Sequence, residues 1–217
     1  MRAAPLIALA AGCLVAAAVY PALTHMRDDA HVASPAVPVA SGARITYPAD
    51  KLPTIELGEG RREAIRSVLN VAAPLRFGTY VWNEERVPAG PVWIYVDLSR
   101  QLLSVFRGGH EIGSAVILYG ASNKPSPTGA FPVLQKAADY HSRTYDAPMP
   151  FMLRLTADGV AIHGSNVRDG AATHGCIGVP TEFARRLYQH IALGDRVVIV
   201  RPAAGATASA PARLPVG

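Results

Sequence analysis

Two histidines and a cysteine lie close together in "AIHGSNVRDGAATHGCIGVP", residues 161–180 of this 217-residue chain. A free cysteine thiol has a pKa of about 8.5 and is a weak nucleophile at neutral pH. A neighbouring imidazole can convert the thiol to thiolate. We therefore expect His163, His174 and Cys176 to form a thiol site that attacks a carbonyl group, as in an acyltransferase or a hydrolase.

His163 is the better candidate for the general base. It ends a predicted strand, and the glycines that follow it allow the loop to fold back to Cys176. His174 lies only two residues from Cys176, and such near neighbours rarely meet head-on. A third group should orient the imidazole, and both Asp169 and the backbone carbonyl of Gly164 are available for this role.

Gly175 has a separate use beside the nucleophile. A glycine here lets the backbone turn tightly, so that N–H groups from about His174 to Cys176 can point at one spot. Converging N–H groups stabilise the oxyanion of an attacked carbonyl.

Two other interpretations of these residues remain open. Two histidines and a cysteine are acceptable zinc ligands, and three protein ligands plus water is the catalytic zinc pattern. The chain has no CxxC or HExxH spacing to support a zinc site. The second interpretation is a buried structural cysteine between histidines that have hydrogen-bond partners.

The elements around this segment read as mostly β. Residues 92–96 and 102–106 predict a hairpin, and residues 151–155 and 159–163 predict another with Asp158-Gly159 as its turn. Apolar residues at four-residue intervals predict a helix over 181–191, with Thr181 as N-cap and Gly194 beyond its end. The remaining predicted elements are a helix at 59–70 and strands at 79–83, 110–120, 129–133 and 196–200.

The N-terminal residues 1–26 carry Arg2 and then no charged residue until Arg27. This pattern predicts a secretory signal peptide or a retained membrane anchor, since about 20 apolar residues span a bilayer. Cys13 in "LAAGC" raises lipid attachment as an alternative. We therefore expect an exported protein of the periplasm or cell envelope. A retained anchor would tether it to the inner membrane.

The rest of the chain divides by composition. Residues 27–58 predict an Ala/Pro-rich linker, 59–90 a helical and strand lead-in, 91–201 the catalytic domain and 202–217 a disordered tail. Removal of the leader would leave Cys176 without a second cysteine for a disulfide. We expect a monomer.

The net charge of +5 comes from scattered Lys and Arg. The chain contains no run of five or six like charges, which a nucleic-acid-binding arm would show, and no glycine-rich phosphate loop. The charge suits an anionic partner such as cell wall or membrane.

The segments "IHG…THGCIGVP", "IYVDLSRQLLSVFRGGHEIGSAVILYG", "SPTGAF" and "GDRVVIV" together resemble the L,D-transpeptidase catalytic domain, also called the YkuD domain. The resemblance covers about residues 91–201. It implies a mainly β, L,D-transpeptidase-like β-sandwich with one helix following the catalytic cysteine. It also implies action on peptidoglycan stem peptides, with no metal or organic cofactor.

The resemblance further implies roles for the site residues. Cys176 would cleave the diaminopimelate–D-alanine bond of a tetrapeptide stem and pass the acyl group to an amine, forming a 3→3 cross-link. His163 would be the base, oriented by the carbonyl of Gly164 in place of Asp169. The acceptor could instead be water or a protein amine, and a non-catalytic wall-binding domain of the same fold is a further alternative.

Other positions follow from the same resemblance. His174 and Gly175 would shape the oxyanion hole, and Thr173 would support the loop and border the substrate. Segment 135–150 would form a lid, with Tyr145 and Met149 lining the substrate groove; the alternative is a solvated loop with a packed methionine.

The chain departs from the family pattern at Gly178, where the family usually has arginine. The loop between His163 and Cys176 is also slightly short. Both differences bear on donor preference more than on the chemistry.

Overall fold

The computed structural model describes residues 37–38, 44–71 and 73–202. These residues form a mainly β structure with two main sheets, two small hairpins and one helix, α1 (Thr181–His190). The strands of the larger, nine-stranded sheet are β1 (Val37–Pro38), β2 (Ile45–Thr46), β5 (Ser67–Val68), β6 (Thr79–Trp82), β7 (Val92–Asp97), β8 (Leu102–Arg107), β9 (His110–Val116), β10 (Gly129–Pro132) and β17 (Arg196–Val200). The smaller sheet contains β11 (Gln135–Ala137), β14 (Met152–Arg154), β15 (Ala161–Ser165) and β16 (Ile177–Pro180).

The larger sheet is buried on both faces at its centre. Strands β7, β8 and β9 are antiparallel neighbours, which confirms the hairpin expected over 92–106, and β17 pairs with β7 in parallel. Along β7, Ile94 and Val96 pack into the main core, whereas Trp93 and Tyr95 pack into a second core on the opposite face. Alternate side chains of β7 therefore enter two different cores, one on each face of the sheet.

The smaller sheet has the order β11-β14-β15-β16. The expected hairpin is present, since β14 pairs with β15 in antiparallel orientation and Gly159 has φ 102° in the turn. Strand β16 is parallel to β15, so residues 166–176 form the connection between them. The inner face of the smaller sheet contributes Leu153, Ile162, Ile177 and Val179 to the main core.

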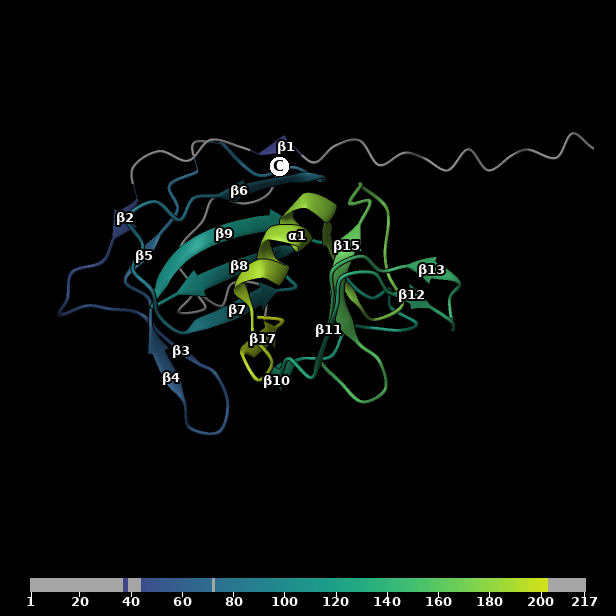
Figure 1. Cartoon of the computed structure of the whole chain (residues 1–217). Helices are drawn as coiled ribbons and strands as arrows, with labels where there is room; N and C mark the ends of the chain where they lie inside the picture. Colours follow the sequence, from purple (N-terminus) through teal and green to yellow (C-terminus); the bar gives the residue numbers. More distant parts are fainter. Residues whose placement is uncertain (1–36, 39–43, 72, 203–217) are drawn as a thin grey trace, which may run out of the picture. The chain divides into compact units, whose positions relative to one another are not determined.

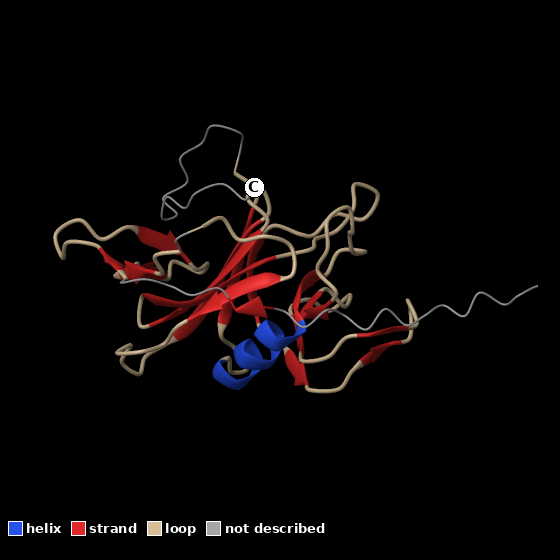
Figure 2. Cartoon of the chain, turned by 90° about the horizontal axis from the view of Figure 1, so that it is seen from above, coloured by secondary structure: helices blue, strands red, loops and turns tan. Residues whose placement is uncertain are grey.

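The helix α1 closes the main core against this sheet. Phe183 and Leu187 are fully buried there, and the helix packs beside β15 (Figures 1 and 2). The expected N-cap is one residue off, because Pro180 occupies the cap position and Thr181 is the first helical residue, without a side-chain cap bond. Lys136 Nζ donates to the carbonyl of Tyr188 at 2.8 Å near the other end.

Two sequence-based expectations for the N-terminal half are wrong. Residues 44–58 are not a linker, because they include β2 and β3 (Thr54–Glu56), and Ile55 and Leu57 are buried in the second core. The helix expected at 59–70 is replaced by β4 (Arg62–Ala64) and β5. The turn between β3 and β4 has positive φ at Gly58, Glu59 and Gly60, which is incompatible with a helix beginning there.

The helical spacing of apolar residues in this stretch has another explanation. Ile65 and Val68 join the second core, while Leu69 joins a third cluster with Val81 and Val116. An irregular strand distributes these side chains between two surfaces, so the apparent helical face does not exist.

Within the described residues, no helix is long and apolar enough to cross a membrane. The leader or anchor expected at 1–26, Cys13 and nearly all of the tail expected at 202–217 lie outside them.

Candidate active site

Strands β15 and β16 place His163 and Cys176 on the same face of the smaller sheet. Their parallel register pairs Ile162 with Ile177 and His163 with Gly178. Cys176 directly precedes β16, and side chains alternate between the faces of a sheet. Cys176 and His163 therefore point to the same face, opposite the face on which Ile162 and Ile177 enter the core.

The ring of His163 is oriented by the backbone. Its Nδ1 lies 2.9 Å from the carbonyl oxygen of Gly164, and since a carbonyl only accepts, Nδ1 carries the hydrogen and Nε2 is the basic nitrogen. Gly164 is itself fixed, because its N–H donates to Pro150 O at 2.8 Å. A Cβ at Gly164 would lie 3.1 Å from Pro150 Cγ, so the position favours glycine.

Asp169 does not orient this ring. Its carboxylate accepts a hydrogen bond from Gly170 N at 2.8 Å, and it lines a cavity of about 560 Å³ together with Tyr119 and Arg201. The residues alone left both orienting groups open and the resemblance favoured the Gly164 carbonyl, which is the one that bonds to His163.

The thiol of Cys176 is free and lies over an apolar cluster formed by Met149, Met152 and Ala161. Its Sγ donates to the carbonyl of Gly159 at 3.9 Å. The cysteine is only partly buried. It therefore has an apolar base and an open side from which a substrate can approach.

Burial sets the protonation states of both groups. Burial raises the pKa of Cys176 from 9.0, although the backbone of Ala161 and the charge of Lys124 lower it in part. Burial also lowers the pKa of His163 from 6.5, against the opposing effect of the Gly164 carbonyl. Both shifts favour the neutral forms of the pair, a thiol and an imidazole.

The loop before the thiol is held by hydroxyl groups. Thr173 Oγ1 donates to the carbonyl of Cys176 at 2.5 Å and accepts from Gly175 N at 3.3 Å. Ser126 Oγ donates to the Gly175 carbonyl at 2.9 Å and accepts from Gly120 N at the same distance. The Thr173 hydroxyl thus holds the loop, and a contact of Thr173 with substrate stays a prediction.

Ser126 was missed as a site residue. It is almost fully buried, and it belongs to the "SPTGAF" segment that carried part of the resemblance. Gly175 has φ 110°, as the expected tight turn requires. Its N–H is bonded to Thr173, so a contribution of this group to an oxyanion hole stays a prediction.

Tyr145 lies against the predicted site through His174. The two rings are stacked, with centroids 4.6 Å apart and planes at 13°. Tyr145 lies on the connection between β12 (His141–Ser142) and β13 (Ala147–Pro148), inside the segment expected to be a lid. Lys124, which sequence reasoning did not single out, donates to Tyr145 Oη at 2.5 Å.

Met149 is buried in the cluster beneath the thiol, with 7% of its surface exposed. This is the packed methionine of the alternative interpretation, and a direct contact with substrate stays a prediction.

Gly178 lies in a narrow space between two neighbouring segments of the chain, at Ser165 and Leu118. A Cβ added there would be 3.0 Å from Ser165 Cβ and 3.4 Å from Leu118 Cβ. Leu118 pairs with Gly178 through hydrogen bonds in both directions, at 2.8 and 3.0 Å. Any larger side chain at this position requires Ser165 to shift by a few tenths of an ångström.

No group of three His, Cys, Asp or Glu side chains in the described part of the chain is arranged to hold a metal ion. His174 instead stacks on Tyr145. The donor set required by the zinc interpretation is not assembled.

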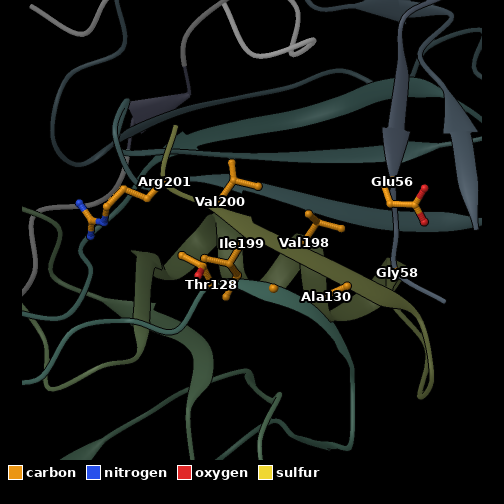
Figure 3. A pocket seen from close by; sticks show the side chains of 9 residues that line it. Glu56, Gly58, Thr128, Ala130, Val198, Ile199, Val200 and Arg201 are labelled. Atoms are coloured by element: carbon orange, nitrogen blue, oxygen red, sulfur yellow. The ribbon is translucent and has the colours of Figure 1, made fainter. Parts of the chain in front are cut away.

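A second cavity of about 650 Å³ lies along β17 and β10, away from these residues. Its lining includes Val198 and Val200, which lie between Glu56 and Arg201 in Figure 3. Neither this cavity nor the one beside Asp169 is lined by the candidate catalytic residues.

The model of the L,D-transpeptidase catalytic domain family matches residues 91–199 of the chain. No curated protein matches it.

Solved structures with a similar fold include three L,D-transpeptidases. One from Stackebrandtia nassauensis is 22% identical, with TM-score 0.48, and the match covers 53% of this chain and 58% of that one. One from Mycobacterium tuberculosis H37Rv is 21% identical, with TM-score 0.47 and coverages of 51% and 57%. An Enterococcus faecium enzyme with a cysteine-to-serine substitution is 23% identical, with TM-score 0.47 and coverages of 52% and 50%. This chain thus covers less than two thirds of each.

Proposed function

This chain belongs to the L,D-transpeptidase catalytic domain family, and on that premise we propose that it is a peptidoglycan L,D-transpeptidase whose nucleophile is Cys176. Its donor is a tetrapeptide stem, cleaved between diaminopimelate and the terminal D-alanine. Its acceptor is an amine of a second stem, which gives a 3→3 cross-link. This activity requires export to the cell envelope, where peptidoglycan stems are found.

One observation carries the assignment of roles. Cys176 and His163 share the outer face of the β15–β16 pair, and Nδ1 of His163 is engaged by the carbonyl of Gly164. This leaves Nε2 as the only basic nitrogen of the ring. An imidazole held in one tautomer beside a thiol is the arrangement that general-base activation of a nucleophile requires.

The neutral resting pair supports proton transfer during the attack. As Cys176 Sγ bonds to the carbonyl carbon, its proton passes to Nε2 of His163. When the carbon–nitrogen bond breaks, that proton goes to the amine nitrogen of the departing D-alanine, and a thioester remains. Attack by the acceptor amine forms the new amide and returns the thiol, so that neither an oxidant nor a cofactor is consumed.

The test is incubation of the purified protein with a disaccharide-tetrapeptide muropeptide and mass analysis of the products. We expect loss of D-alanine together with a cross-linked dimer. Loss of D-alanine without a dimer would assign water as the acceptor and replace the transpeptidase by a carboxypeptidase. Unchanged muropeptide would overturn both enzymatic assignments.

An intact-mass measurement gives an independent check of the nucleophile. A carbapenem should add one drug mass to the wild-type protein and none to Cys176→Ala. An adduct of equal yield on the variant would show that another residue is acylated.

A further inference from the structure

Two exposed hydrogen-bond donors lie together beside the thiol. Lys124 Nζ donates to Tyr145 Oη at 2.5 Å and lies 5.3 Å from the centroid of the Tyr145 ring. Because the ammonium group has only donors, the phenol oxygen is the acceptor of this bond and its own hydrogen is left to donate to a third group. The pair therefore offers an N–H and an O–H from two hydrogen-bonded atoms.

Backbone contacts place this pair next to the nucleophile. A Cβ built at Gly175 would lie 3.9 Å from Lys124 O and 3.7 Å from Pro125 O, so the 124–125 turn borders the residue before Cys176. Tyr145 reaches the same loop by stacking on His174. The charge of Lys124 also acts on the thiol, since it opposes the rise that burial causes in the pKa of Cys176.

The negative charge of Asp158 also acts on this region, since it raises the pKa of both Cys176 and Lys124. Gly175 also faces Val160, whose Cγ2 would be 3.9 Å from an added Cβ. Asp158 precedes Gly159, whose carbonyl accepts from Cys176 Sγ, and its carboxylate bonds with the Thr156 hydroxyl. An anionic ligand is repelled by the Asp158 carboxylate and attracted by Lys124, which favours placing its charge at Lys124.

We propose that Lys124 and Tyr145 form a carboxylate clamp that binds the C-terminal carboxylate of the donor peptide, that is, the carboxylate of the amino acid released when Cys176 is acylated. The proposal rests on the proposed function. Only an amide nitrogen and one Cα separate this carboxylate from the carbonyl carbon under attack. A carboxylate held by a clamp bordering Gly175 therefore brings the carbonyl to the adjacent Cys176.

The clamp gives the enzyme a means of selecting a chain end. A carboxylate accepts from both donors at once, and hydrogen bonds between charged groups are the stronger kind. An amide at the same position carries no charge and presents its own N–H groups to the lysine. The same holds for a stem that continues beyond the released residue, because an internal peptide bond replaces the carboxylate.

The experiment compares two donors on each protein: the tetrapeptide stem with a free C-terminal carboxylate, and the same peptide ending in an amide. kcat/KM for release of the terminal residue is measured for wild type, Lys124→Met and Tyr145→Phe. The ratio of the two donors on one protein cancels any change in thiol acidity that loss of Lys124 causes. Tyr145→Phe keeps the ring on His174 and removes only the hydroxyl, while Lys51→Met is the control for loss of an exposed positive charge.

We expect wild type and Lys51→Met to prefer the carboxylate by about 10- to 150-fold, the range for one charged hydrogen bond of about 1.5–3 kcal/mol. Lys124→Met should bring the ratio close to one, and Tyr145→Phe should lower it in part. Equal rates of Cys176 alkylation by iodoacetamide at matched thiolate fraction, and equal thermal unfolding, would show that the variants are folded. An unchanged ratio in Lys124→Met overturns the clamp.

Equilibrium binding to Cys176→Ala separates the clamp from the proposed function. Tighter binding of the carboxylate peptide, lost on adding Lys124→Met, supports the clamp even if wild type releases nothing, in which case the proposed function fails alone. Release without a carboxylate preference overturns the clamp and leaves the function. If neither binding nor release is observed, both the clamp and the proposed function are overturned. A donor amidated only on the diaminopimelate side chain should behave as the unmodified one; if it loses the preference instead, the clamp is not for the terminal carboxylate.

Discussion

The two main sheets differ in how many of their faces are covered. At the centre of the nine-stranded sheet both faces are buried, so that Ile94 and Trp93 enter separate cores from adjacent positions of β7. The four-stranded sheet is buried on the face of Ile162, while its other face carries His163 and the partly buried Cys176. The candidate catalytic residues thus lie on the outer face of the smaller sheet, which is only partly covered, by the apolar cluster of Met149, Met152 and Ala161.

This contrast predicts that activity and stability separate by location. Substitutions on the outer face of β15 and β16 should remove reaction steps and leave the fold intact. Substitutions in the cores on the two faces of the larger sheet should destabilise the fold. The molecules that remain folded should keep their activity.

The largest effect is expected for Cys176→Ala. Release of D-alanine and acylation by a carbapenem should fall below detection, because no other thiol is present among the described residues. The midpoint of thermal unfolding should change little, since the cysteine is only partly buried. The measurements are muropeptide turnover and calorimetry, and full turnover by the variant would contradict the role of Cys176.

His163→Ala should slow acylation by about 10²- to 10⁴-fold, the usual contribution of a general base. His163 acts in its neutral form, and its pKa is lowered from 6.5 by burial. The acidic limb of kcat/KM for wild type should therefore lie below pH 6.5.

The same pH profile measured on His163→Ala provides the control. The acidic limb due to this imidazole should be absent from the variant. A limb that persists unchanged would assign the titration, and the base, to another group.

Phe106→Ala tests the doubly covered sheet. Phe106 is 1% exposed and stacks on Trp93, with centroids 4.1 Å apart. Loss of a buried phenylalanine costs about 3–5 kcal/mol, so urea unfolding should show a decrease of this size in the free energy of unfolding. Turnover per folded molecule should stay close to wild type, and a large loss of kcat without destabilisation would break the contrast between the sheets.

The smallest effect is expected for Glu84→Gln. Glu84 accepts hydrogen bonds from Arg107 and His190, both at 2.9 Å, and so links β8 to the end of α1. Burial raises its pKa, but the bonds from His190 and Arg107 outweigh it and leave the pKa below 4.5. Because its carboxyl is 39% exposed, the loss of stability should be under about 1 kcal/mol.

The stability difference between wild type and Glu84→Gln should depend on pH in a defined direction. A carboxylate with a lowered pKa in the folded state stabilises the protein above its unfolded pKa, and that stability is lost as pH falls through the folded pKa. The difference between wild type and Glu84→Gln should therefore be present at pH 7 and diminish below about pH 4.5. A difference that grows in acid would show that Glu84 is not bonded as its carboxylate.

The strands near the site were predictable because their signals are local. Alternation along 92–106, the Asp158-Gly159 turn and the apolar repeat over 181–191 each follow from the period of the element itself. The N-terminal segment was not predictable in this way. Ile65, Val68 and Leu69 matched a helical face, but pairing with distant strands and two separate cores determine their conformation.

The sequence by itself determined the identity of the candidate nucleophile and base, because cysteine and histidine chemistry belongs to the residue type and their family motif is contiguous. Only the tertiary structure shows two other features: the burial that favours the neutral thiol, and the bond between Lys124 and Tyr145 beside the loop that carries Cys176. Each depends on hydrogen-bond geometry, burial or distance between segments, and these quantities exist only after β15, β16 and the loops beside them have packed together.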